Sequence, residues 1–234
     1  MSSFFLTIDD APSSHTGNKL RTLDKLGIKA IWFCQGNNLE KHQEIAVKII
    51  CSGHIIGNHS YSHPFFSETS FDDCRDEIVT TEDIIDGIYD KARVLRLAKF
   101  FRFPYGEPGH YANGKPSDEP EKIFHRNRLQ KLLRELGFQS NVFLSADSSG
   151  KYMQGVDWMW SYDVREWAID RLGEYGSSLE EVEKDLVAYL RSYNRNKNQI
   201  VLMHDSEKCT KHFDHLLNIF IEAGVSFKLP TFEA

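Results

Sequence analysis

Short apolar segments alternate with longer amphipathic segments along nearly the whole chain, and this alternation restricts the fold more than any other feature. Strand followed by helix, repeated about seven times, favours a parallel sheet that closes or nearly closes into an α/β barrel. The apolar segments predict strands at 4–8, 29–33, 54–57, 99–103, 157–162, 199–203 and 225–229. The amphipathic segments predict helices at 17–26, 40–51, about 71–88, 121–136, about 179–190 and 210–223.

The chain has 234 residues, of which 41% are hydrophobic and 26% are charged, which is enough apolar material for a full core. We see no internal repeat, linker or break in composition, and we therefore expect a single domain over residues 1–234. The net charge of −6 argues against nucleic acid or an anionic membrane surface as the main partner.

The N-terminus and the cysteines bear on the compartment. The chain begins MSSFFLTIDD, without the basic and apolar regions of an export signal, and no run of ~18 apolar residues predicts membrane insertion. Cys34, Cys51, Cys74 and Cys209 lie far apart and form no CxxC pair. We expect buried, reduced thiols rather than a thiolate zinc site, although an even number leaves disulfides open. The expected location is cytoplasmic.

Polar clusters follow five of the predicted strands. They are TIDD (7–10), HSYSH (59–63), RFPYG (102–106), DVREW (163–167) and LMHD (202–205). In α/β barrels the chemistry takes place at the carboxyl ends of the strands. The sequence therefore predicts one functional site at this rim.

His59 and His63 are four positions apart. On one helical turn their side chains would face the same way and could bind a single cation. A carboxylate from the Asp9–Asp10 pair is the best candidate for a third ligand, and its neighbour could then serve as general base. Two imidazoles and one carboxylate leave coordination positions open, as a catalytic zinc site requires.

Hydrolysis also needs a proton for the leaving group, and His204 follows a strand with a ring suited to general acid catalysis. A carboxylate of DVREW could orient it, Arg102 could fix the base carboxylate, and the backbone N–H of Tyr105 could donate to an oxyanion. Taken singly, each cluster has an ordinary structural interpretation, such as a turn, a solvated histidine pair or a core tryptophan. Their combination on one rim favours a hydrolytic metal site.

In this order the five clusters resemble the motifs TFDDGP, H[ST]xSH, RxPYG, DxxDW and LxH of the NodB-homology polysaccharide deacetylases, the family four carbohydrate esterases. The segments GIKAIWFCQGN and GHIIGNHSYSHP also resemble that family. The resemblance implies a distorted (β/α)7-type barrel, a divalent metal that is usually zinc but is cobalt or another ion in some members, and hydrolysis of an N-acetyl group on a sugar.

The resemblance also implies roles for individual residues. The implied catalytic base is Asp9, supported by Arg102, and the implied acid is His204. The implied metal ligands are Asp10, His59 and His63, while Tyr105, Trp167 and Leu202 would contact the substrate's acetyl group.

The chain departs from the family motifs at three positions. Ile8 and Ala11 replace the usual Phe and Gly, and we expect only repacking there. Glu166 stands where the family usually has Asp, so the tether to His204 would be repositioned by one methylene. Asp163 is kept, and we expect it to bind Arg102.

The expected substrate is an N-acylated amino sugar or oligosaccharide, and in the cytoplasm a short chitooligosaccharide, a nucleotide-linked or lipid-linked N-acetylamino sugar, or a formylated amino sugar. The loops at 106–120 and 139–156 would shape the site. Tyr111, Tyr152 and Trp158 could stack on sugars, whereas Trp160 is expected in the core. Two alternatives stay open: a non-catalytic metal-containing carbohydrate-binding protein, and an amidohydrolase acting on a non-sugar amide such as a cyclic ureide.

Overall fold

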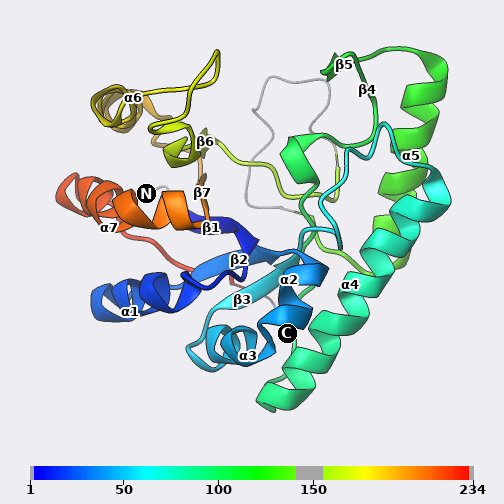
Figure 1. Cartoon of the computed structure of the whole chain (residues 1–234), viewed down its shortest axis with the longest axis horizontal. Coiled ribbons are helices and arrows are strands. Elements are labelled where there is room, and N and C mark those ends of the chain that lie inside the picture. Colours follow the sequence, from blue (N-terminus) through cyan, green and yellow to red (C-terminus); the bar gives the residue numbers. More distant parts are fainter. Residues whose placement is uncertain (1–2, 141–154, 232–234) are drawn as a thin grey trace.

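The computed structural model describes residues 3–140 and 155–231 (Figure 1). The strands are β1 (Phe4–Ala11), β2 (Ala30–Cys34), β3 (Ile55–Asn58), β4 (Tyr111–Ala112), β5 (Lys115–Pro116), β6 (Tyr162–Asp163) and β7 (Gln199–His204). The helices are α1 (Thr16–Leu26), α2 (Gly36–Lys41), α3 (Gln43–Cys51), α4 (Phe71–Ala92), α5 (Pro120–Glu135), α6 (Leu179–Ser192) and α7 (Glu207–Glu222), with short 3₁₀ turns η1 (Pro104–Gly106) and η2 (Glu166–Ala168).

Five strands form one parallel sheet in the order β3-β2-β1-β7-β6. Beyond β3 the sheet continues only through isolated contacts: Asn58 bridges Phe101, and the Trp158 N–H donates to the Phe101 carbonyl at 2.7 Å. The α/β fold with a parallel sheet is confirmed. In the described part of the chain the ladders do not form a continuous closed barrel.

For three segments, the prediction of a regular strand was wrong. Residues 99–103 and 225–229 contribute single bridges, and of 157–162 only Tyr162 belongs to a strand, β6. Their aromatic side chains are divided between separate core clusters, Phe100 and Trp158 in one and Phe101 in another. Burial of these aromatic residues produced the apolar pattern without a ladder. The two-stranded hairpin β4–β5 was not predicted.

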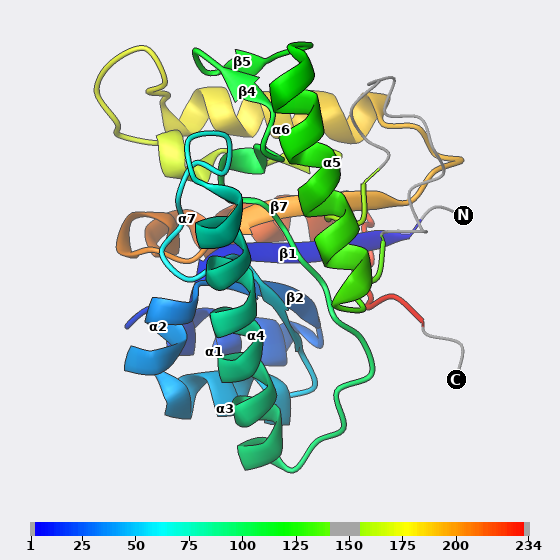
Figure 2. The ribbon, with the colours of Figure 1, turned by 90° about the vertical axis from the view of Figure 1, so that its right-hand side faces the viewer.

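The helices pack around the sheet, with α4 and α5 along one side (Figure 2). The largest core cluster joins β1, β2 and β7 to the inner faces of α1, α3, α6 and α7, and the fully buried Trp32 belongs to it. Serine side chains cap two of the helices: Ser70 accepts from the Asp73 N–H at the start of α4, and Ser178 forms a capping box with Glu181 at the start of α6. All four cysteines are free thiols, and Cys51 is exposed. Among the described residues, no helix combines the length and apolar character needed to span a membrane.

Candidate active site

One pocket of about 380 Å³ lies where the carboxyl ends of the strands meet. All predicted site residues except Arg102 and Glu166 line it, and those two are buried beside it. The pocket is lined by Asp9, Asp10, His59, His63, Tyr105, Gly106, Trp160, Asp163, Trp167, Arg171, Leu202 and His204.

The backbone at this rim adopts an uncommon conformation. Non-glycine residues with positive φ include Asp10 at 65°, Ser60 and His63 at 63°, Tyr105 at 59° and Arg165 at 62°. Such left-handed residues cost conformational energy and persist where the surrounding structure holds them, often at functional sites. Four of the five polar clusters contain at least one, so the site is constructed with sharp local turns.

Asp10, His59 and His63 form a compact group. The Asp10 Oδ1 atom lies 3.7 Å from His59 Nε2 and 3.3 Å from His63 Nε2. His59 Nδ1 lies 2.8 Å from the Arg102 carbonyl oxygen. That oxygen only accepts hydrogen bonds, so Nδ1 carries the proton and the Nε2 lone pair remains available to a cation. Two imidazole nitrogens and one carboxylate oxygen fit a catalytic zinc or cobalt site.

The prediction that the two histidines share a helical turn was wrong. Residues 59–63 form an irregular loop between β3 and α4. The Ser60 N–H donates to the side chain of Asn58 at 2.9 Å, and the N–H groups of Tyr61 and Ser62 donate to Glu77 Oε2 at 2.8 and 2.7 Å. These bonds hold the loop so that both rings converge on Asp10.

The protonation states favour cation binding. Burial, with a contribution from His59, lowers the pKa of His63 to about 4. Burial works to raise the pKa of Asp10, but the nearby histidines outweigh it and lower this pKa. At neutral pH the group therefore offers an uncharged imidazole at His63 and an ionised carboxylate, the forms in which these side chains bind metals.

Asp9 lies between this group and a buried arginine, and its Oδ2 atom is 3.7 Å from His59 Nε2. Its Oδ1 atom accepts from Arg102 Nη1 at 2.6 Å, and the side chains of Asp9 and Arg102 are 5% and 0% exposed. Arg102 also donates to Thr7 and to the carbonyl of Trp158. The prediction that Asp163 binds Arg102 was wrong: Asp163 accepts from the Arg165 N–H at 2.8 Å and from Trp167 Nε1 at 3.2 Å. Arg102 therefore forms its ion pair with Asp9.

His204 is held by the glutamate that replaces the family's aspartate. Glu166 Oε1 lies 3.3 Å from His204 Nδ1 and also accepts the His204 backbone N–H. Burial works to lower the pKa of His204, but the hydrogen bond and charge of Glu166 raise it to about 9. The glutamate side chain, one methylene longer than aspartate, thus contacts both Nδ1 and the backbone N–H of His204. Together with Asp163, these two residues form a second group whose ligand atoms lie close enough to hold a metal ion. Because Glu166 and His204 already contact each other directly, we interpret this group as a hydrogen-bonded cluster.

Sequence reasoning missed several pocket residues. Trp160, expected in the core, is half-buried and lines the pocket, whereas Trp158, a candidate for sugar stacking, is fully buried. Alternation gave no signal to separate them, since residues two positions apart on a strand face the same side. Arg171 had no signal at all. Tyr111 does not line the pocket, and Tyr152 lies outside the described residues.

A buried ion pair behind the site was also missed. Lys19 Nζ lies 2.9 Å from Asp205 Oδ1, and both side chains are 0% exposed. Asp205 also accepts from the Ser13 N–H, and its own N–H donates to the Asp9 carbonyl at 2.8 Å. The pair therefore ties α1 to the ends of β1 and β7, which present the candidate base and acid.

Comparison with known proteins supports the motif resemblance. The family model described as Polysaccharide deacetylase matches residues 2–115. A peptidoglycan-N-acetylglucosamine deacetylase of Bacillus cereus is 41% identical over 105 residues, which cover 44% of this chain and 36% of that protein. A peptidoglycan-N-acetylmuramic acid deacetylase of Bacillus subtilis is 34% identical over 102 residues, covering 43% and 21%. The matched stretches span well under half of these two relatives.

Solved structures extend the likeness to the whole fold. A family 4 carbohydrate esterase from Streptomyces lividans, in complex with acetate, superimposes with a TM-score of 0.66 at 21% identity, covering 97% of this chain and 92% of that one. A pseudoenzyme of the same family from Bacillus anthracis gives a TM-score of 0.64 at 22% identity, covering 97% and 63%. At such identities the likeness concerns the fold alone, which is shared by an esterase and a pseudoenzyme.

Proposed function

The chain belongs to the NodB-homology polysaccharide deacetylases, the family 4 carbohydrate esterases, and from this premise we propose that it is a metal-dependent hydrolase that removes an N-acetyl or related acyl group from an amino sugar or short oligosaccharide. One observation carries the proposal. The group of Asp10, His59 and His63 shares a single pocket with an arginine-paired aspartate, Asp9, and a glutamate-paired histidine, His204.

In the proposed site, Asp10, His59 and His63 hold a divalent cation, zinc or cobalt. When bound, such an ion supplies Lewis acidity toward an acyl oxygen and lowers the pKa of water. Both effects make hydrolysis of an amide feasible at neutral pH.

The remaining residues move protons and hold the substrate. Asp9 accepts a proton from the attacking water, and the ion pair with Arg102 orients its carboxylate. His204 donates a proton to the leaving nitrogen, and Glu166 keeps its ring protonated. The backbone N–H of Tyr105 faces the developing oxyanion. Trp167 and Leu202 form the apolar wall against the acyl methyl group.

Release of acyl groups tests the proposal. Zinc- or cobalt-loaded protein is expected to release acetate or formate from at least one of chitooligosaccharides, UDP-N-acetylglucosamine and a formylated amino sugar. Asp9→Asn should keep the metal, which Asp9 does not hold, and lose roughly 10²–10⁴-fold in kcat, the usual contribution of a general base. Equal rates for wild type and Asp9→Asn would contradict the proposed base.

The pH dependence tests the acid. Because the pKa of His204 is raised to about 9, the ring is protonated at neutral pH, and kcat is expected to fall as the pH rises through this pKa. Glu166→Gln removes the hydrogen bond and charge that raise it, so the basic limb of the profile should move to lower pH. Glu166→Asp should keep the limb close to its original position. An unchanged limb in Glu166→Gln would assign the acid to another group.

A second candidate function keeps the pocket without turnover. The similar fold of the family pseudoenzyme from Bacillus anthracis motivates it. Sugar binding with metal present, but no acyl release across the panel, would favour a metal-containing carbohydrate-binding protein. Cleavage of a cyclic ureide instead of any sugar would favour the amidohydrolase alternative.

A further inference from the structure

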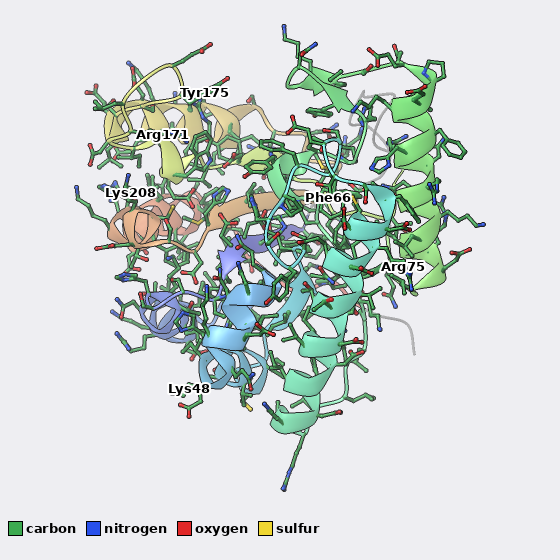
Figure 3. The ribbon with its side chains drawn as sticks, turned by 45° about the vertical axis from the view of Figure 1, so that its right-hand side comes forward. Lys48, Phe66, Arg75, Arg171, Tyr175 and Lys208 are labelled. Atoms are coloured by element: carbon green, nitrogen blue, oxygen red, sulfur yellow. The ribbon has the colours of Figure 1, made fainter. Side chains whose placement is uncertain are left out.

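An arginine with no assigned role lines the pocket. Arg171 lies on the segment that connects η2 to α6, and its side chain is exposed (Figure 3). None of the motifs includes this residue. Among the described residues that line the pocket, it is the one basic side chain apart from the histidines.

The backbone of Arg171 is fixed although its side chain is exposed. Its N–H donates to the Ala168 carbonyl at 3.1 Å, and the segment is closed at its base by a bridge between Ile169 and Ser177. The chain then returns so closely that a Cβ atom on Gly176 would lie 2.0 Å from the Arg171 carbonyl oxygen. Only glycine fits at that position. The close packing of Gly176 against the Arg171 backbone therefore fixes the point from which the Arg171 side chain extends.

The guanidinium group lies over an ordered aromatic ring. Its central carbon is 5.6 Å from the centre of the Trp167 ring, and the indole is held by its hydrogen bond to Asp163. The centre of the same ring is 6.5 Å from that of His204. Stacking on a fixed indole limits the orientations of the guanidinium and keeps it beside the proposed acid.

Within residues 3–140 and 155–231, no carboxylate forms an ion pair with Arg171. The neighbouring Asp170 pairs with Lys211 at 3.4 Å instead. A planar guanidinium binds a carboxylate or phosphate through two parallel hydrogen bonds, which a neutral hydroxyl cannot match. The Arg171 guanidinium, which has no ion-pair partner among the described residues, thus offers its N–H donors near the proposed position of the leaving nitrogen.

We propose that Arg171 is a specificity-determining residue that binds an anionic oxygen group, a carboxylate or a phosphate, carried by the sugar next to its N-acyl group. This inference rests on the proposed function for the position of the sugar. It predicts that the protein discriminates between sugars that differ only in an anionic substituent.

Equilibrium binding to the zinc-loaded full chain in the Asp9→Asn background, where turnover is suppressed, tests this. The ligands are N-acetylmuramic acid for the carboxylate, N-acetylglucosamine 1-phosphate for the phosphate, and N-acetylglucosamine as the neutral reference. At least one anionic sugar should bind roughly 10-fold or more tightly than the reference, and Arg171→Gln should abolish most of that preference. Whichever anionic sugar gains most identifies the source of the anion.

Two further variants separate charge from position. Arg171→Lys keeps the charge but loses the fork, and should retain only part of the preference. Arg75→Gln removes an exposed arginine on α4, across the molecule from the pocket (Figure 3), and should leave the preference unchanged.

Three outcomes would overturn the inference: equal binding of anionic and neutral sugars by the parent protein, a preference that survives in Arg171→Gln, and an equal loss in Arg75→Gln. A surviving preference would assign the anion to the metal. Failure of the proposed function is distinguishable, because a protein that releases no acyl group in any background can still show the Arg171-dependent preference.

Discussion

Replacing Asp10 by alanine is expected to abolish stoichiometric zinc binding and, with it, acyl release. Removal of a residue that only orients a ligand typically costs 10- to 100-fold in metal affinity, so loss of a direct ligand should cost more than about 100-fold. Asp10 Oδ1 lies within 3.7 Å of the Nε2 atoms of both His59 and His63, so its removal leaves two imidazoles without the carboxylate of the proposed ligand set. The zinc content of purified protein and a competition titration with a chelator measure the effect.

A matched variant controls for zinc that binds to histidines outside the proposed ligand set. His42 lines the neighbouring groove beside Asp10 but lies outside the group of three ligands. His42→Ala should therefore bind one zinc per chain as the wild type does, while His63→Ala should lose it as Asp10→Ala does. Tight binding of one zinc by Asp10→Ala would remove Asp10 from the ligand set. The short distances from Asp10 Oδ1 to the two histidines would then reflect hydrogen bonding alone.

Replacing Arg102 by methionine is expected to destabilise the metal-free protein by about 3–5 kcal/mol, the range found when one partner of a buried ion pair is removed. Arg102 and Asp9 are both buried, and their atoms approach to 2.6 Å. Methionine fills much of the same volume, so the main consequence is an aspartate whose charge has lost its partner in a low-dielectric site. Urea unfolding without metal isolates this effect, because bound metal would add its own stabilisation.

The double variant Arg102→Met/Asp9→Asn distinguishes the lost pairing from lost packing. With no charge left on either side, part of the stability should return, and the two single changes should fail to add by 1 kcal/mol or more. Simple additivity would mean that Arg102 stabilises the protein through its contacts with Thr7, Phe33 and the Trp158 carbonyl. Its role toward Asp9 would then be secondary.

Much of the fold followed from the sequence, because long periodic segments report burial directly. The strands around 4–8, 29–33, 54–57 and 199–203 and most helices appear close to where the pattern placed them. The pattern reports burial and not hydrogen bonding, however. This is why 99–103 and 157–162 looked like strands: their aromatic side chains are buried, but their backbones make only isolated contacts with the sheet.

At the site, residue types were easier to predict than local geometry. The order of the motifs named the three residues that lie together as a possible metal-binding group, and the residues that we propose as base and acid. It could not show that His59 and His63 meet across a loop, since the left-handed turns at Ser60 and His63 occur in non-glycine residues. It paired Arg102 with Asp9 but wrongly added Asp163 as a partner of Arg102, and it gave no sign that Arg171 lines the pocket, because both depend on how distant segments pack.

The register of the central ladder has a consequence for the reaction path. Asp9 and His204 are paired positions on the neighbouring parallel strands β1 and β7, and neighbouring strands lie about 4.8 Å apart. The spacing between the proposed base and the proposed acid is thus set by the register and separation of two strands, and not by the loops. Inserting one residue into either strand would turn one of the two side chains to the opposite face. Loop variation can therefore change the entrance to the pocket while the spacing of these two residues stays the same.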